Sequence, residues 1–274
     1  MNYFTSAFFI FFTICNFAFS KDASFASYQQ ILNKHLKSYE TGETAFDYAS
    51  AKKDAQTQTC IKRQIHELEN FDLSALINNG EKLAFWLNTY NFTIVRFIVQ
   101  HYNEDLKSIR DLGSLLTPVW KKSHLIAGQQ RSFDDIEHGI VRPLAKKMFQ
   151  GSKNGLYAAR VHFALNCASI GCTPLSKNIY VSSKLNIQLD AATKDALKID
   201  RHLSVSNDKV ILSHIFEWFK EDFAHDSGSL KNWLLKWAPE SKSKPIQAAK
   251  DDSDFSYVDY AWNLNKVTTV SNKQ

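Results

Sequence analysis

The sequence predicts an α+β fold that is rich in helices and forms a single domain around a small sheet. Helical spacing of apolar residues recurs along most of the chain, whereas strand-like stretches are few and short. The predicted helices and strands do not alternate regularly, which argues against a repeating β–α architecture. After its first 20 residues the chain has a usual length for one domain. Its 20 Phe, 10 Tyr and 6 Trp supply ample apolar surface for a core.

Residues 1–20 are expected to be a signal peptide and residues 21–274 the domain itself. An apolar run fills residues 4–19, and the Ala-Phe-Ser tripeptide that ends at Ser20 fits the small-residue rule for cleavage. The run is shorter than the about 20 residues that span a bilayer. We therefore expect an exported, periplasmic or extracellular protein with no stable membrane span after cleavage. The positive charges that usually precede such a run are missing, so an uncleaved anchor is the alternative.

The N-terminal half is predicted to be helical at residues 24–38, 59–69 and 80–101. The third helix is the strongest, because apolar side chains cover it almost all round, which favours a central position in the fold. Asn88 and Asn91 interrupt its apolar surface three residues apart, on one face. Buried amides need hydrogen-bond partners, so these two side chains are expected to anchor a polar network.

A further helix is expected to begin near Asp134, with Ser132 or Asp134 itself as its cap. Pro143 lies inside this helix. A proline ring clashes with the carbonyl four residues back and removes a hydrogen bond. We therefore expect a kink or a break next to Glu137 and His138.

The remaining elements include a loop that carries three reactive or polar side chains. The pattern predicts a hairpin around 127–129, strands at 161–167, 210–212 and 255–262, and helices at 183–197, 215–223 and 230–237. The strand at 161–167 is apolar and runs into a loop with Cys167, Ser169 and Cys172. Loops at the ends of rigid strands commonly carry function, so this loop is the most informative part of the chain.

Four blocks of sequence carry a resemblance to a known family. They are AFWLNTYN at 84–91, DDIEHGIVRP at 134–143, HFALNCASIGCTPL at 162–175 and IFEWFKEDF at 215–223, followed by an ending at 257–265. The chain resembles DUF547, a domain of unknown function, over about residues 75–265. The family occurs in exported bacterial proteins and in plant proteins, and its fusions to glutaredoxin-like domains hint at thiol chemistry. The resemblance implies no particular reaction, and Thr173 stands where the family often has a proline.

Cys167 is the candidate nucleophile, because cysteine is strongly nucleophilic even near its unperturbed pKa. A base must lie within hydrogen-bond reach of it, and His138, which is next to Glu137, and His162 are the candidates. Regular strand alternation would instead turn Cys167 toward the apolar face, opposite to His162, as expected of a buried structural cysteine. Both interpretations of Cys167 stay open.

Cys167 and Cys172 also allow a disulfide, either as a loop staple or as a redox-active pair, and an exported protein permits it. Outside the leader Cys60 is the third cysteine, and it is expected to be structural. The spacing of cysteines and histidines matches no standard zinc pattern, so neither a metal nor another cofactor is expected. Ser169 is expected to satisfy the turn, or else to donate a hydrogen bond to an oxyanion.

The first functional hypothesis is a cysteine-dependent hydrolase or acyl-transferase of the cell envelope. It would act on an amide or thioester bond of an unidentified small-molecule or peptide substrate. Cys167 would attack the carbonyl, His138 would be the base, and the supporting group would be one of three: Glu137, Asn88 or Asn91. The histidines precede the cysteine, so kinship with papain-like or transglutaminase-like enzymes would require a permuted chain.

A non-catalytic binding module is the competing hypothesis. It would recognise a polar ligand through Asn88, Asn91, His138, Arg142 and His162. A third hypothesis is a thiol-redox protein that uses Cys167 and Cys172. The formal net charge of +5 is mild and spread along the chain. No basic stripe interleaved with aromatic residues is visible, so a nucleic-acid partner is not expected.

Overall fold

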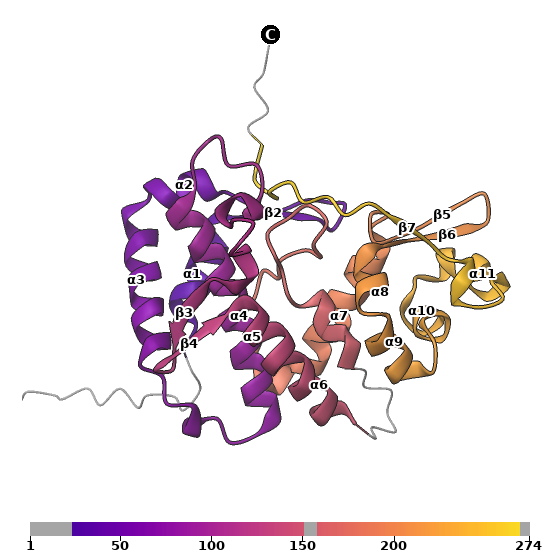
Figure 1. Ribbon diagram of the computed structural model, residues 1–274, viewed down its shortest axis with the longest axis horizontal. Helices are drawn as coiled ribbons and strands as arrows, with labels where there is room; N and C mark the ends of the chain where they lie inside the picture. Colours follow the sequence, from indigo (N-terminus) through magenta and orange to yellow (C-terminus); the bar gives the residue numbers. More distant parts are fainter. Residues whose placement is uncertain (1–23, 151–157, 269–274) are drawn as a thin grey trace, which may run out of the picture.

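The computed structural model describes residues 24–150 and 158–268, so the predicted signal peptide lies outside the described residues. The α+β prediction is confirmed: the fold is rich in helices and contains small sheets (Figure 1). The first half contains α1 Ala26–His35, β1 Leu36–Ser38, β2 Thr44–Phe46, α2 Tyr48–Lys53, α3 Ala55–Glu69, α4 Asn79–His101, β3 Ser123–Ile126, β4 Gln129–Ser132, α5 Phe133–Ile136 and α6 Arg142–Phe149. The second half contains α7 Leu185–Lys198, β5 Leu203–Ser206, β6 Lys209–Ser213, α8 His214–Trp218, α9 Lys220–Ser227, α10 Leu230–Trp237, α11 Glu240–Ala248 and β7 Ser256–Val258.

Helix α4 is the central element, as its apolar surface predicted. Asn78 and Glu81 form a capping box at its start, which satisfies backbone N–H groups that have no partner inside the helix. Nearly every residue of α4 after this first turn is buried. The helix therefore forms a scaffold against which the other elements are fixed.

The predicted polar network on α4 is confirmed. The Asn88 amide donates to the Tyr180 carbonyl and accepts from the Tyr180 N–H, at 2.8 Å each. The Asn91 amide donates to the Ala164 carbonyl at 2.8 Å and accepts from the Asn166 N–H at 2.9 Å. These bonds tie α4 to the backbone on both sides of the Cys167 loop.

The predicted kink before Pro143 is present as a π-helical turn. Ser132 caps α5 in a capping box with Asp135, and the chain then makes a π-helix over Glu137–Val141 before α6 begins. A wider turn accommodates a proline that can neither donate a hydrogen bond nor tolerate the usual carbonyl spacing. The π turn carries both Glu137 and His138, so it sets the direction of these two candidate side chains.

The strand predicted at 161–167 is wrong. Residues Ala158–Phe163 form a 3-10 helix that is buried throughout, and an irregular turn follows. An apolar run that is buried on all sides lacks the alternation that identifies a strand. Ala159 and Phe163 belong to one hydrophobic core cluster, while Val161 and Leu165 belong to the other. The segment thus lies between two cores, and strand parity does not separate His162 from Cys167.

Three small sheets complete the described residues. Strands β1 and β2 are antiparallel, and β3 and β4 form the predicted hairpin. The hairpin turns at Ala127 and Gly128, with φ of 51° and 71°, as a two-residue hairpin turn requires. In the third sheet β5 and β6 are antiparallel, whereas β7 is parallel to β6.

After β7 the chain returns across the molecule toward β2 as an extended segment (Figure 1). The predicted strand at 255–262 is therefore a sheet strand only at its start. The returning segment pairs with the Cys167 loop instead: the N–H groups of Ile170 and Gly171 donate to the carbonyls of Asn263 and Ala261, each at 2.8 Å. This pairing holds the last aromatic residues of the chain against the loop.

Candidate functional site

A pocket of about 170 Å³ contains four of the predicted site residues. They are Glu137 and His138 on the π turn, His162 on the 3-10 helix and Cys167 in the loop. Further lining residues include Tyr90, Trp120, Asp134, Leu165, Ile215, Trp218, Phe219, Tyr260 and Trp262. Six separate parts of the chain therefore converge on one hollow, which none of them forms alone.

Cys167 and Cys172 form a disulfide, with 6.0 Å between their Cα atoms. Cys167 is half-buried and lines the pocket, whereas Cys172 is buried behind it and does not. Cys60 is a free, buried thiol and lies on another pocket. The free Cys167 thiol that the hydrolase hypothesis requires is thus available only after reduction.

Hydrogen-bond donors surround the two sulfur atoms. The Cys167 N–H lies 2.8 Å from the Cys172 Sγ, and the Tyr260 hydroxyl lies 3.1 Å from it. The Ser169 hydroxyl lies 2.9 Å from the Cys167 Sγ. Burial raises the pKa of Tyr260, so its hydroxyl stays protonated and can donate at neutral pH.

His162 is the imidazole with the more constrained environment. Its Nε2 lies 2.9 Å from the Asp222 carboxylate, and its ring stacks on Phe219 with 3.9 Å between ring centroids. Since a carboxylate accepts, Nε2 carries the hydrogen and Nδ1 is the free base. That Nδ1 is buried and has no hydrogen-bond partner. Burial lowers the pKa of His162 against the opposing effect of Asp222, so the ring is neutral at pH 7.

Asp222 is buried and holds three cationic or polar partners. Arg142 Nε lies 2.8 Å from one carboxylate oxygen and Lys146 Nζ lies 2.7 Å from the other, in addition to His162. Burial by itself raises the pKa of Asp222. The hydrogen bonds from His162, Arg142 and Lys146 together outweigh burial and hold this pKa well below its usual range. Arg142, predicted to bind ligand, here supports the orienting carboxylate.

His138 is more exposed than His162 and is loosely held. Its Nε2 is 3.9 Å from Asp134, and its Nδ1 is 3.2 Å from Arg142. Among the described residues Glu137 forms no hydrogen bond or ion pair with His138; the Glu137 carboxylate accepts from the Tyr90 hydroxyl at 3.1 Å instead. Asn88 and Asn91 bind backbone and do not line this pocket.

A comparison with known protein families identifies the family of the segment that contains the disulfide and both histidines. The model of DUF547, described as a protein of unknown function, matches residues 74–196. This part of the chain belongs to the DUF547 family. The resemblance predicted from the sequence blocks is confirmed over these residues, which include the disulfide and the two histidines. No curated protein and no solved structure matches the chain, so kinship with a permuted papain or transglutaminase fold stays a prediction.

Several side chains that line the pocket or support His162 lie beyond the DUF547 match and were missed as site residues. Asp222, Trp218, Tyr260 and Trp262 come from the C-terminal quarter of the chain. Their signal was present in the block at 215–223 and in the ending at 257–265, which were used for the resemblance alone. Sequence spacing cannot show that Asp222 meets a histidine 60 positions earlier.

Aromatic side chains form a continuous wall of the pocket. Ring centroids of Trp218 and Tyr260 are 4.7 Å apart, those of Tyr260 and Trp262 are 4.6 Å apart, and those of Trp120 and Trp262 are 6.0 Å apart. Trp218 is 47% exposed, which is unusual for so large an apolar side chain. The wall therefore offers accessible π faces to a ligand.

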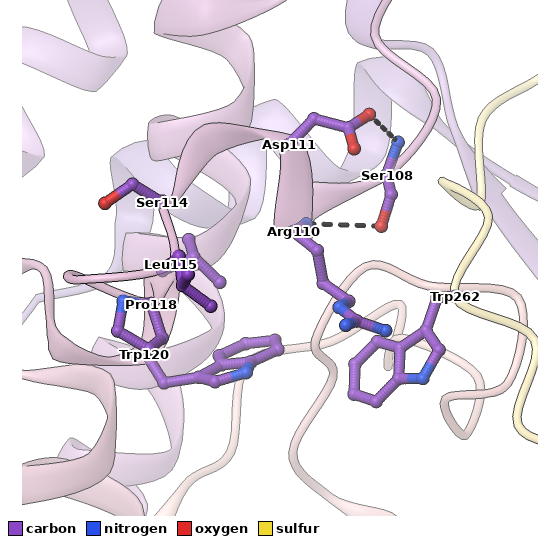
Figure 2. Close-up of a pocket in the computed structure, with 9 residues that line it drawn as sticks. Ser108, Arg110, Asp111, Ser114, Leu115, Pro118, Trp120 and Trp262 are labelled. Atoms are coloured by element: carbon purple, nitrogen blue, oxygen red, sulfur yellow. Dashed lines mark hydrogen bonds between the residues drawn. The ribbon is translucent and has the colours of Figure 1, made fainter.

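A larger pocket of about 620 Å³ adjoins the first one and shares Trp120 and Trp262 with it (Figure 2). Ser108 and Asp111 cap a short 3-10 turn there, and the Arg110 side chain points toward Trp262. No histidine or cysteine lines this second pocket. The imidazoles and the Cys167 sulfur therefore line the smaller pocket, although the neighbouring one has more room.

The described residues contain no group of three or more His, Cys, Asp or Glu side chains arranged to hold a metal ion. Within the same residues no helix has the length and apolar character needed to cross a membrane.

Proposed function

We propose that the protein is a thiol–disulfide exchange protein whose reactive group is the Cys167–Cys172 disulfide. The observation that carries this proposal is the unequal access to the two sulfurs: Cys167 lines a pocket, and Cys172 is buried behind it. Exchange depends on which sulfur an incoming thiolate can reach. A purely structural staple has no need of a pocket at one of its sulfurs.

The proposed reaction begins when a substrate thiolate attacks the Cys167 Sγ. A new bond forms between the substrate sulfur and Cys167, the Cys167–Cys172 bond breaks, and Cys172 leaves as a thiolate. A second substrate thiolate then attacks the substrate sulfur of the mixed disulfide and releases Cys167. The substrate loses two electrons and becomes a disulfide, while the protein gains them and becomes a dithiol.

Neighbouring groups favour both halves of the first step. A leaving thiolate departs faster when its charge is stabilised, and the Cys167 N–H and Tyr260 hydroxyl are positioned to donate to Cys172. An attacking thiol must lose a proton. The unpartnered Nδ1 of neutral His162, oriented by Asp222, is a suitable acceptor on the same pocket.

Export would supply the conditions that this function needs. Disulfides persist in oxidising compartments and are rare in the cytosol. The predicted signal peptide and the disulfide therefore support each other, and both favour a periplasmic or extracellular location.

A redox titration tests the proposal. The purified protein is equilibrated in glutathione buffers of graded potential, alkylated, and analysed by mass spectrometry at each cysteine. We expect Cys167 and Cys172 to be reduced together, with a midpoint between about −120 and −270 mV, the range of exchange proteins. A midpoint below about −300 mV would identify a structural disulfide and overturn the proposal.

Trapping identifies the attacked sulfur. In Cys172→Ser the Cys167 thiolate attacks oxidised glutathione, keeps one glutathione as a mixed disulfide and releases the other in reduced form. No neighbouring thiol can resolve this mixed disulfide, so we expect a stable adduct at Cys167. Cys60→Ser is the matched control, because it removes a buried thiol outside the pocket, and should leave the titration unchanged. Equal adduct formation at Cys172 in Cys167→Ser would contradict the proposed order of attack.

A cysteine-dependent hydrolase or acyl-transferase is the second candidate. It is favoured by the pairing of His162 with Asp222 beside Cys167, since such enzymes orient their imidazole with a third group. Here His162 replaces His138 as the proposed base. The two candidates differ in their need for Cys172: reduced Cys172→Ser should still cleave a thioester if the protein is a hydrolase, and should lose catalytic exchange if it is a redox protein.

A further inference from the structure

We propose that the pocket selects substrates that carry an organic cation, an ammonium or a guanidinium group, next to the reacting thiol. That the substrate carries a thiol rests on the proposed exchange function, whereas cation binding can be measured without any exchange reaction. Three features of the pocket support the inference. They are an aromatic wall, a carboxylate without a cationic partner, and arginine side chains of the protein that already lie over aromatic rings of the pocket.

The aromatic wall provides the surface that organic cations prefer. Trp120, Trp218, Tyr260 and Trp262 line the pocket, with neighbouring centroids between 4.6 and 6.0 Å apart. A cation over the face of Trp or Tyr is attracted by the negative potential of the ring, and several rings together recognise ammonium groups well. A neutral apolar ligand gains no such electrostatic attraction.

Glu137 supplies the negative charge. Its carboxylate lines the pocket and accepts one hydrogen bond, from the buried hydroxyl of Tyr90. Among the described residues no lysine or arginine forms an ion pair with it. The second carboxylate of the pocket, Asp134, is already paired with Lys121 at 2.9 Å. Glu137 is therefore the carboxylate that is free to bind a ligand cation.

Two arginines of the protein already lie over aromatic rings that line the pocket. The Arg110 guanidinium lies 5.0 Å from the centroid of Trp262 (Figure 2), and that of Arg142 lies 5.0 Å from Phe219. Trp218 has no such partner among the described residues and is 47% exposed. We infer that the ligand cation lies against Trp218, within reach of Glu137.

Binding of two isosteric probes tests the inference. Choline and its neutral isostere 3,3-dimethylbutan-1-ol are titrated into the oxidised protein by isothermal calorimetry. We expect choline to bind at least tenfold more tightly than the alcohol, and Glu137→Gln to remove most of this preference. Equal affinities, or a preference that survives in Glu137→Gln, would overturn the inference.

Two further variants serve as controls for this experiment. Glu240→Gln also removes one negative charge, at an exposed position outside the pocket, and should bind choline as the wild type does. If Glu137→Gln unfolds, Trp218→Leu serves instead, because Trp218 is half exposed and its replacement leaves the core intact. An unchanged choline affinity in Trp218→Leu would also overturn the inference.

A series of thiols of different charge connects the inference to exchange. The disulfide is reduced with cysteamine, 2-mercaptoethanol or 3-mercaptopropionate, and each rate is corrected for the thiolate fraction. We expect cysteamine to react at least tenfold faster than 3-mercaptopropionate, and Glu137→Gln to level the rates. The corrected rates of Cys-Lys and Cys-Glu dipeptides are then compared with that of cysteamine. This comparison shows whether the preferred cation is carried by a peptide or by a small amine.

The two proposals fail in different ways. If no thiol reduces the disulfide but choline still binds through Glu137, the exchange function is wrong and the cation site stands. If all thiols react at one corrected rate and choline binds no better than the alcohol, the cation site is wrong and exchange stands.

Discussion

Two histidines that line the same pocket are each paired with a carboxylate, and the two pairs differ in almost every physical respect. His162 and Asp222 are 2.9 Å apart, with side chains only 1% and 4% exposed. His138 and Asp134 are 3.9 Å apart, with side chains 46% and 27% exposed. The chemical groups are identical, so the contrast isolates the effect of burial and support.

Burial turns the first pair into a fixed unit. Water screens charges near the surface, whereas the protein interior strengthens both favourable and unfavourable interactions. Asp222 must therefore keep its partners, and Arg142 and Lys146 complete them. Asp134 can exchange its partners for water. The buried pair is the better candidate to orient a base, because its imidazole has one direction only.

Removal of the buried carboxylate should have the largest effect. In Asp222→Ala the Nε2 hydrogen of His162 and the Arg142 guanidinium lose their acceptor inside the protein. Breaking a buried charge pair in this way costs about 3 kcal/mol or more. Urea denaturation at pH 7 measures the free energy of unfolding; a loss below about 1 kcal/mol would show that the two pairs are energetically alike.

The second-largest effect is expected from acid, which should lower the free energy of unfolding through His162. Because burial lowers the native pKa of His162, the unfolded chain binds a proton below about pH 6.5 that the native protein does not. Stability is therefore complete above pH 6.5 and falls as the pH decreases, by about 1.4 kcal/mol per pH unit for such a group.

His162→Gln should remove this contribution while its amide still donates to Asp222. Between pH 7.5 and 5.5 we expect the variant to lose less stability than the wild type in urea denaturation. His202→Gln is the matched variant: burial lowers the pKa of His202 to about 3, and His202 does not line the pocket. It should reduce the pH dependence similarly. An unchanged pH dependence in His162→Gln would contradict a buried neutral imidazole.

The contrast between the pairs also explains what sequence alone could predict. Helix α4, its two asparagines and the turn before Pro143 depend on local patterns, and all three were predicted correctly. The segment around His162 was predicted as a strand because a run buried between two cores carries no period. His138 was the preferred base because a carboxylate is its neighbour in sequence. Asp222, the partner that matters in space, is 60 residues from His162.

The exposed pair should respond least. Asp134 forms an ion pair with Lys121 and lies near His138. Both partners are exposed, so water can replace the contacts that they lose when the Asp134 carboxylate is removed. For Asp134→Asn we expect a change in unfolding free energy within about 0.5 kcal/mol, as for other surface substitutions. Measuring it in low and high salt sharpens the comparison, since screening acts on exposed pairs and spares buried ones. A loss as large as that of Asp222→Ala would mean that the His138 side of the pocket is the rigid one, and would return His138 to the position of proposed base.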